Sequence, residues 1–379
     1  MDAVLGSGEI LCIVGARPNF MKIAPIMRAF AHPDSALSAR LLHTGQHYDA
    51  AMKHAFFDQL HIPEPDVDLE VGSGTHAQQT ADIMKRFEPV LDAAPPRAVL
   101  VVGDVNSTIA CALVAVKKGI PVIHVEAGLR SGDRSMPEEI NRILTDQLSE
   151  LLFITEASAL DNLQKEGIAR NKVHFVGNVM IDTLRYNLSD AVPSHTTLTN
   201  ANVRKSGLSD GKYGLVTLHR PSNVDDPVAL AGLLKVLVQI SRRIPLLFPI
   251  HPRTESRIAA AGLESTVADS AITLIPPQGY LEMLGLMKDA RVVLTDSGGI
   301  QEETTALGVP CITLRENTER PITVSQGTNT VVGTDVDRIM ACFEDVLRTG
   351  GKLGRIPELW DGNAAARIVD IVNRWAATR

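Results

Sequence analysis

At 379 residues, 45% of them hydrophobic and 21% charged, the chain is long enough to bury the cores of two α/β domains. A formal net charge of −7 argues against a general nucleic-acid or membrane surface. No apolar run reaches the roughly 18 residues of a membrane span, and the first residues lack the basic segment of a signal peptide. The four cysteines are far apart and form no C-x-x-C pair, so we expect buried reduced thiols and a cytoplasmic protein.

Short apolar runs alternate with helical stretches along nearly the whole chain. Predicted strands lie at residues 10–14, 39–43, 98–102, 122–125, 151–154, 173–176, 215–218, 246–250, 272–274, 292–294 and 311–314. Predicted helices include residues 75–91, 106–118, 138–150, 156–166 and 364–377. This alternation indicates an α/β protein with parallel sheets covered by helices on both faces.

The alternation lapses at residues 189–212, where Ser, Thr, Asn, Asp and Gly cluster. We therefore predict two domains of similar architecture, residues 1–188 and residues 189–363, with the polar segment joining them.

A strand at residues 292–294 delivers the sequence Asp296–Gly299 to the start of a helix. A glycine pair at a helix N-terminus lets backbone N–H groups approach a phosphate, and the helix dipole favours negative charge there. We expect Glu302 and Glu303 in the first helical turn, within reach of ribose hydroxyls. An ordinary tight turn with no ligand is the alternative.

Ligands of open parallel sheets bind beyond the carboxyl ends of the strands. The polar residues at the predicted strand ends are Arg17, Gln46, His47, Asp104, Glu126, His219 and His251. We expect the acids of the first half and the histidine and phosphate-type turn of the second half to face an interdomain cleft. Such a cleft suits a nucleotide-linked substrate.

Structural roles compete with these functional assignments. Asp104 could cap the following helix, and Glu126 could form an ion pair with Arg130 or Arg134.

Glu138 suits the first turn of a helix and lies four residues before Arg142, so it could instead form an ordinary ion pair with Arg142. A histidine at a strand end, such as His219, is as often structural as catalytic.

Two cofactor signatures are missing from the sequence. No G-x-G-x-x-G motif follows a strand, and no G-x-x-x-x-G-K-[ST] motif occurs. Metal-ligand spacing is found only at His43 and His47, across a turn that contains glycine. We therefore expect no nicotinamide, no metal ion and no other cofactor.

Taken together, the polar motifs resemble a known family. In chain order they are G-A-R-P, T-G-Q-H, G-D, H-V-E-A-G-L-R-S-G-D, P-E-E-I-N-R, L-H-R, H-P, T-D-S-G-G-I-Q-E-E and T-E-R-P. In this order they resemble the non-hydrolysing UDP-N-acetylglucosamine 2-epimerases over essentially the whole chain. The resemblance implies two Rossmann-like doubly wound domains of the GT-B type, with the second binding UDP. It also implies that helix 364–379 packs back on the first domain, and that the protein is a homodimer.

The resemblance also implies an activity and assigns residues to it. The expected reaction interconverts UDP-GlcNAc and UDP-ManNAc for polysaccharide biosynthesis, by elimination of UDP to a 2-acetamidoglucal and re-addition. The implied catalytic residues are Asp104, Glu126, Glu138 and His219. The implied substrate-binding residues are Arg17, Lys22, His251, Gln278, Ser297, Gly298, Gly299, Glu303 and Arg320. Gln46 and His47 match a loop near which some members bind a second UDP-GlcNAc as an activator.

Some positions depart from the common pattern of the family. Residues 74–76 lack the arginine-containing motif of regulated members. Asn19 stands where glutamate is common, and the loop between Asp133 and Pro137 is shorter than in some members. Together with Q-H-Y-D-A-A-M and the G-T-H stretch at Gly74, these two shifts also resemble relatives that act on UDP-2,3-diacetamido-uronic acids. Such a substrate is therefore an alternative, as are a GT-B glycosyltransferase, a hydrolysing epimerase and a non-catalytic UDP-sugar sensor.

Overall fold

The computed structural model describes residues 9–45, 56–203, 208 and 212–378. The chain forms two compact units, one comprising Met1–Tyr186 and Glu358–Arg379, the other Asn187–Pro357. The polar segment that we expected to join the domains belongs to the second unit, where part of it forms α8 (Ser194–Asn200) against α13 (Tyr280–Lys288).

In its described residues, the first unit has one sheet of seven parallel strands in the order β3-β2-β1-β4-β5-β6-β7. The strands are β1 (Glu9–Val14), β2 (Ser38–His43), β3 (Val67–Asp68), β4 (Ala98–Val102), β5 (Val122–Val125), β6 (Leu151–Ile154) and β7 (Val173–Phe175). The strand order reverses between β1 and β4, so the loops after these two strands diverge to opposite faces. A doubly wound sheet binds its ligands at such a point.

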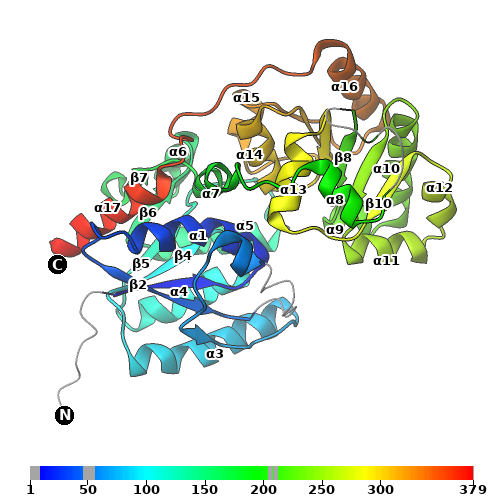
Figure 1. The fold of residues 1–379 in the computed structure, drawn as a ribbon. Helices are drawn as coiled ribbons and strands as arrows, with labels where there is room; N and C mark the ends of the chain where they lie inside the picture. The colour runs from blue at the N-terminus through cyan, green and yellow to red at the C-terminus, as the bar shows by residue number, and fades with distance from the viewer. Residues whose placement is uncertain (1–8, 46–55, 204–207, 209–211, 379) are drawn as a thin grey trace. The chain divides into compact units, whose positions relative to one another are not determined.

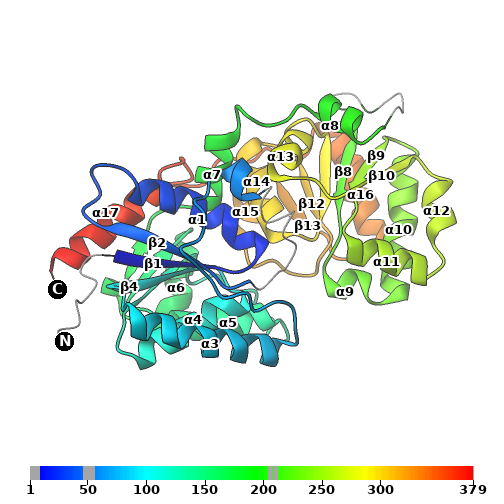
Figure 2. The ribbon, with the colours of Figure 1, turned by 60° about the horizontal axis from the view of Figure 1, so that its bottom comes forward.

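Helices cover both faces of this sheet, as Figures 1 and 2 show. Helix α1 (Arg17–Phe30) packs beside α17 (Ala364–Ala377), and α4 (Asn106–Lys117) packs between α3 (His76–Ala93) and α5 (Pro137–Leu148). The remaining helices are α6 (Ser158–Lys165), the 3-10 turn Arg170–Lys172 and α7 (Val179–Asn187). The interior strands are fully buried, because both faces are covered.

The C-terminal segment is anchored to the first unit by specific bonds. The indole of Trp360, 1% exposed, donates to the carbonyl of Thr155 at 3.0 Å. The carboxylate of Asp182 accepts the N–H groups of Ala364 and Ala365, the first residues of α17, at 3.1 and 2.7 Å. A carboxylate at this position satisfies N–H groups that have no partner within the helix.

The second unit repeats the architecture with six parallel strands, counted over its described residues, in the order β10-β9-β8-β11-β12-β13. They are β8 (Gly214–Thr217), β9 (Leu246–Pro249), β10 (Ile272–Ile275), β11 (Val292–Thr295), β12 (Cys311–Thr313) and β13 (Asn329–Val331). The order reverses between β8 and β11, as it does between β1 and β4 in the first sheet. The loops after β8 and β11 are therefore where the second sheet is expected to bind its ligand.

Two groups of helices cover this second sheet. One group is α9 (Pro221–Val224), α10 (Pro227–Ser241), α11 (Pro252–Ala260), α12 (Glu264–Ala268) and α16 (Val336–Thr349); the other is α13, α14 (Gly298–Leu307) and α15 (Pro321–Ser325). Helices α10 and α16 share one apolar core with the strands, to which Leu233, Leu237 and Phe343 contribute.

The predicted fold class is confirmed, because both units are doubly wound parallel α/β structures. All four cysteines are free, and three of them are buried. Burial raises the pKa of the Cys12 and Cys111 thiols well above their ordinary value, which keeps them unreactive. In the part of the chain that the structure describes, no helix is long and apolar enough to span a bilayer.

Candidate active site

Asp104 follows β4 and is held by an arginine from α5. Its Oδ2 lies 2.5 Å from Nη2 of Arg142, whose Nη1 lies 2.5 Å from Oε2 of Glu139. Arg142 is 3% exposed, so one buried guanidinium joins the two carboxylates. Asp104 directly precedes Val105, the N-cap of α4, and its side chain forms the ion pair with Arg142.

Glu126 follows β5, is 5% exposed and forms an ion pair with Lys22 of α1. Its φ is +74°, in the left-handed region that residues other than glycine rarely occupy. Backbone strain of this kind costs about 1–3 kcal/mol and is common at functional sites. The expectation that Arg130 or Arg134 would be its partner is wrong, because Arg130 bonds Asp146 and α1 brings Lys22 to Glu126.

Both acids lie next to Gly103. A Cβ on Gly103 would lie 2.8 Å from Nζ of Lys22 and 3.7 Å from Oε2 of Glu126. Since Asp104 follows Gly103 in the chain, the acids at the ends of β4 and β5 both lie next to this one glycine. The φ of Gly103 is +67°, which again favours glycine.

The loop after β1 is tied to β4 by Asn19. Its Nδ2 donates to the carbonyl that ends β4 at 2.9 Å, and its Oδ1 accepts from the N–H groups of Gly15 and Ala16 at 3.2 and 3.1 Å. Arg17, the first residue of α1, lies with its guanidinium carbon 4.4 Å from the centre of the Phe56 ring. The asparagine that departs from the family pattern thus shapes the loop that presents Arg17.

Glu138 lies in the first turn of α5 and is partly exposed. Arg142, which the spacing placed four residues after Glu138, forms ion pairs with two other acids. The bonds of Arg142 lead to Asp104 and Glu139, because this face of α5 turns towards the end of β4.

In the second unit, His219 lies just beyond β8 and contacts a buried aspartate. Its Nδ1 lies 3.1 Å from Oδ1 of Asp296, and its ring centre lies 6.0 Å from that of His251. Asp296 also accepts from the N–H groups of His219 and Arg220 and from Nδ2 of Asn223. Burial alone would raise the pKa of Asp296, but the hydrogen bonds and charge of His219, with the backbone N–H groups, hold it below its ordinary value.

This lowered pKa predicts a pH-dependent contribution to stability. An acid whose pKa is depressed by folding stabilises the protein above its unfolded pKa of about 3.9, and the contribution is lost as the pH falls through the folded pKa. We expect Asp296→Asn to lower the free energy of unfolding by roughly 2 kcal/mol at neutral pH, from the loss of charged hydrogen bonds. Urea unfolding of both proteins from neutral to acidic pH measures the difference, which should shrink in acid; a constant difference would contradict this account.

Helix α14 begins with the glycine pair, and Ser297 is its N-cap. The N–H of Ser297 donates to the hydroxyl of Thr295 at 3.0 Å. A Cβ on Gly298 would lie 2.7 Å from Oε1 of Glu319 and 3.2 Å from Nη1 of Arg320. Only a glycine therefore fits against these side chains at the helix N-terminus.

Three arginines surround Glu319 beside this N-terminus. Arg315 and Arg320 lie 3.0 and 3.1 Å from its carboxylate, and Arg220 lies 3.5 Å from it. Nε of Arg320 also lies 3.0 Å from Oε1 of Glu302. Three guanidinium groups therefore lie beside the positive end of a helix, an arrangement that suits an anion.

Glu302 and Glu303 lie in the second turn of α14, because the helix begins at Gly298; the expectation of the first turn is wrong. Burial raises the pKa of the Tyr280 hydroxyl well above its usual range, and the charge and hydrogen bond of the adjacent Glu303 raise it further. Tyr280 therefore stays a neutral phenol beside Glu303. Gln278 donates to the carbonyl of Pro276 at 2.7 Å.

Gln46 and His47, which the sequence suggested as regulatory, lie outside the described residues. Within the described residues, no group of three or more His, Cys, Asp or Glu side chains has the arrangement of a metal site.

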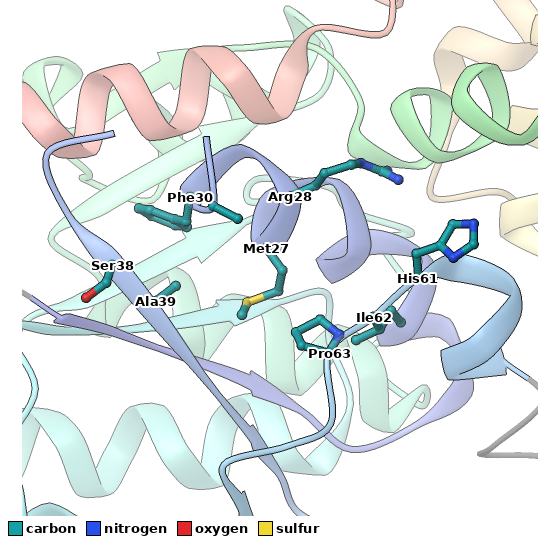
Figure 3. A pocket seen from close by; sticks show the side chains of 9 residues that line it. Met27, Arg28, Phe30, Ser38, Ala39, His61, Ile62 and Pro63 are labelled. Carbon is teal, nitrogen blue, oxygen red and sulfur yellow. The ribbon is translucent and has the colours of Figure 1, made fainter. Parts of the chain in front are cut away.

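A hollow of about 600 Å³ in the first unit lies away from the candidate site (Figure 3). Its lining includes Met27 and Phe30 from the C-terminal end of α1 and Ser38 from the start of β2. The candidate residues of this unit lie towards the opposite ends of α1 and the strands, so this hollow is separate from them.

Several residues that build the site were not predicted as site residues. They are Asn19, Phe56, His124, Glu139, Arg142, Asp146, Asp296, Arg315 and Glu319. Asp296 could have been found from its place at a strand end, directly before the glycine turn. Glu139 with Arg142 and Arg315 with Glu319 have the spacing of local ion pairs. His124 and Asp146 had no such signal, because they lie on different elements, β5 and α5.

Comparisons with known proteins agree with this arrangement. The sequence model of a family described as UDP-N-acetylglucosamine 2-epimerase matches residues 31–373. A UDP-N-acetylglucosamine 2-epimerase of Methanococcus maripaludis is 41% identical over 367 residues, which are 96% of this chain and 98% of the relative. A UDP-2,3-diacetamido-2,3-dideoxy-D-glucuronate 2-epimerase of Pseudomonas aeruginosa is 43% identical over 335 residues, 88% of this chain and 90% of the relative.

Among solved structures, the chain is similar to the Methanocaldococcus jannaschii UDP-GlcNAc 2-epimerase in complex with UDP-GlcNAc and UDP. The TM-score is 0.88 and the identity 41%, over 97% of this chain and 99% of that one. The match covers both units and nearly the full length of each relative. The chain therefore belongs to the UDP-N-acetylglucosamine 2-epimerase family.

Proposed function

We propose that the protein is a non-hydrolysing UDP-N-acetylglucosamine 2-epimerase that interconverts UDP-GlcNAc and UDP-ManNAc. The observation that carries the proposal is the pair of acids at the ends of β4 and β5. Asp104 and Glu126 both lie next to one glycine, and each is held by a buried cation, Arg142 or Lys22. Membership of the epimerase family supports the same activity.

The chemistry requires acid–base groups at C2 of the sugar. The C2–H bond has no adjacent carbonyl to acidify it, so UDP leaves first and the developing positive charge at C1 loosens the proton. A carboxylate takes that proton, which leaves a 2-acetamidoglucal and UDP. Delivery of a proton to the other face of C2, with return of UDP to C1, gives the epimer. We assign these proton transfers to Asp104, Glu126 and Glu138.

The leaving diphosphate requires a positive, preorganised site. We assign this role to the start of α14 at Ser297, Gly298 and Gly299, to His219 and to Arg17. Donors aimed at a developing anion contribute about 3–4 kcal/mol each to transition-state stabilisation. We further propose that Glu303 contacts the ribose, Gln278 the uracil side, and Lys22, His251 and Arg320 other parts of the substrate.

A second substrate is supported by a specific observation. The relative of Pseudomonas aeruginosa that is 43% identical is described as acting on a UDP-2,3-diacetamido-glucuronate. We therefore take UDP-2,3-diacetamido-uronic acid as the second candidate. The same acid–base chemistry at C2 serves either sugar.

NMR of the enzyme with each UDP-sugar alone tests the proposal. We expect signals of the C2 epimer to appear with UDP-GlcNAc, and the larger kcat/KM identifies the native sugar. Free N-acetylmannosamine and UDP would indicate a hydrolysing epimerase instead. An unchanged spectrum with both sugars would contradict the proposal and favour a sensor or a glycosyltransferase awaiting its acceptor.

We also propose that the protein is a cytoplasmic homodimer that supplies a sugar donor for polysaccharide biosynthesis. The resemblance to the family supports these points. Light scattering of the purified protein measures the assembly, and a mass of one chain would contradict the dimer.

A further inference from the structure

His124 is a buried histidine of β5 for which the proposed reaction has no direct use. None of its side chain is exposed. Its Nδ1 lies 2.7 Å from Oδ1 of Asp146, and its Nε2 lies 2.9 Å from the carbonyl oxygen of Gly103. Both ring nitrogens therefore face oxygen atoms. A carbonyl oxygen has no hydrogen to donate, so Nε2 must carry one.

The surroundings of Asp146 indicate where the second hydrogen lies. Its other oxygen accepts from the N–H of Gly128 at 3.1 Å and from Nη2 of Arg130 at 2.7 Å. Hydrogen bonds to the charged form and a guanidinium nearby favour an ionised carboxylate. With Asp146 ionised, Nδ1 of His124 is the donor of the 2.7 Å bond. Arg130 is itself held by Glu166 at 2.6 Å, so charges of alternating sign run from Glu166 to His124.

We propose that His124 is an imidazolium that positions Asp104. Its Nε2 holds the carbonyl of Gly103, the residue bonded to Asp104, and Nζ of Lys22 would lie 2.8 Å from a Cβ on the same glycine. The carbonyl of Asp104 accepts from Nδ2 of Asn141 at 2.9 Å. The turn is thus held on both sides of the catalytic carboxylate. The role of Asp104 rests on the proposed function; the protonation of His124 does not.

The protonation of His124 is tested on the unmodified protein by NMR with 15N-labelled histidine. We expect hydrogen on both ring nitrogens at neutral pH. His174 provides an internal reference. Burial and the nearby Arg170 and Arg374 lower its pKa, so one of its ring nitrogens should be unprotonated at neutral pH. Loss of a signal in His124→Gln assigns the resonance, and through-bond correlation assigns it if that variant does not fold. An unprotonated ring nitrogen on His124 at neutral pH would overturn the proposal.

The positioning role is tested with Asp146→Asn, which keeps the shape of the side chain and removes its charge. We expect kcat to fall about 10²-fold, the cost of displacing a catalytic group by roughly 1 Å, with KM and UDP affinity unchanged. One nitrogen of His124 should lose its hydrogen in the same protein. Asp182→Asn is the matched control, because this buried aspartate serves α17 and should affect stability without affecting kcat.

The outcomes separate the two proposals. A kcat of the folded Asp146→Asn protein equal to that of the wild type would overturn the positioning role. If the wild-type protein epimerised no UDP-sugar, the proposed function would fail, whereas the NMR measurement would still decide the protonation of His124.

Discussion

Asp104→Asn should lower kcat by about 10²–10⁴-fold, the usual contribution of general acid–base catalysis, and leave UDP binding intact. The amide has the shape of the carboxylate but cannot take a proton from C2. The variant should fold, because Arg142 keeps its ion pair with Glu139 when the charge of Asp104 is removed. Turnover is measured by NMR with saturating UDP-sugar, and UDP affinity by calorimetry.

Glu126→Gln should have a similar effect on kcat and an additional effect on stability. Lys22 would then be buried without the charge of its partner, and breaking a buried ion pair in this way costs about 3–5 kcal/mol.

Asp92→Asn is the control for the Asp104 and Glu126 variants. This exposed acid near the end of α3 pairs with Lys118, away from the carboxyl ends of the strands. Near-normal turnover of both folded site variants would remove the catalytic assignment.

Gly298→Ala should weaken UDP binding about 10²-fold, the equivalent of about 3 kcal/mol from losing one preorganised anion contact. The new Cβ would approach Oε1 of Glu319 to 2.7 Å. Glu319 cannot swing away at low cost, because it is 2% exposed and held by arginines, including Arg315 and Arg320. The N-terminal turn of α14 must shift instead, and its N–H groups would no longer converge on the diphosphate.

Gly232→Ala provides a matched control for this change. Gly232 lies inside α10, and among the described residues no atom beyond its chain neighbours and the nearby backbone of its own helix lies within 4 Å of its new Cβ. Alanine inside a helix is favoured over glycine by about 0.5–1 kcal/mol, so this variant should be more stable and bind UDP normally. Calorimetric titration with UDP compares the three proteins. Equal affinity of Gly298→Ala and the wild type would contradict a diphosphate site at α14.

The interior strands were predictable because burial on both faces leaves a continuous apolar run. Residues 98–102 and 122–125 were predicted with the bounds that β4 and β5 have. The edge strands β3, with only Val67 and Asp68, and β13 (Asn329–Val331) lack such a run. Their extended conformation comes from pairing with β2 and β12, and this pairing cannot be predicted from the local sequence.

The strand-end rule found the main candidates but not the partners that set their charge. Glu126 and Lys22 are distant in sequence, and only the packing of α1 brings them together. The position of Glu303 was wrong by one helical turn for a different reason. Glycine disfavours helices, so the helix was expected to begin after the pair, whereas Gly298 is its first residue.

Turnover in deuterium oxide tests the central claim most directly. If unit 1 carboxylates exchange the C2 proton of a UDP-sugar, the epimer formed from UDP-GlcNAc should carry deuterium at C2, visible as loss of that proton signal. Product that retained the original hydrogen, or no product from either UDP-sugar, would contradict the account.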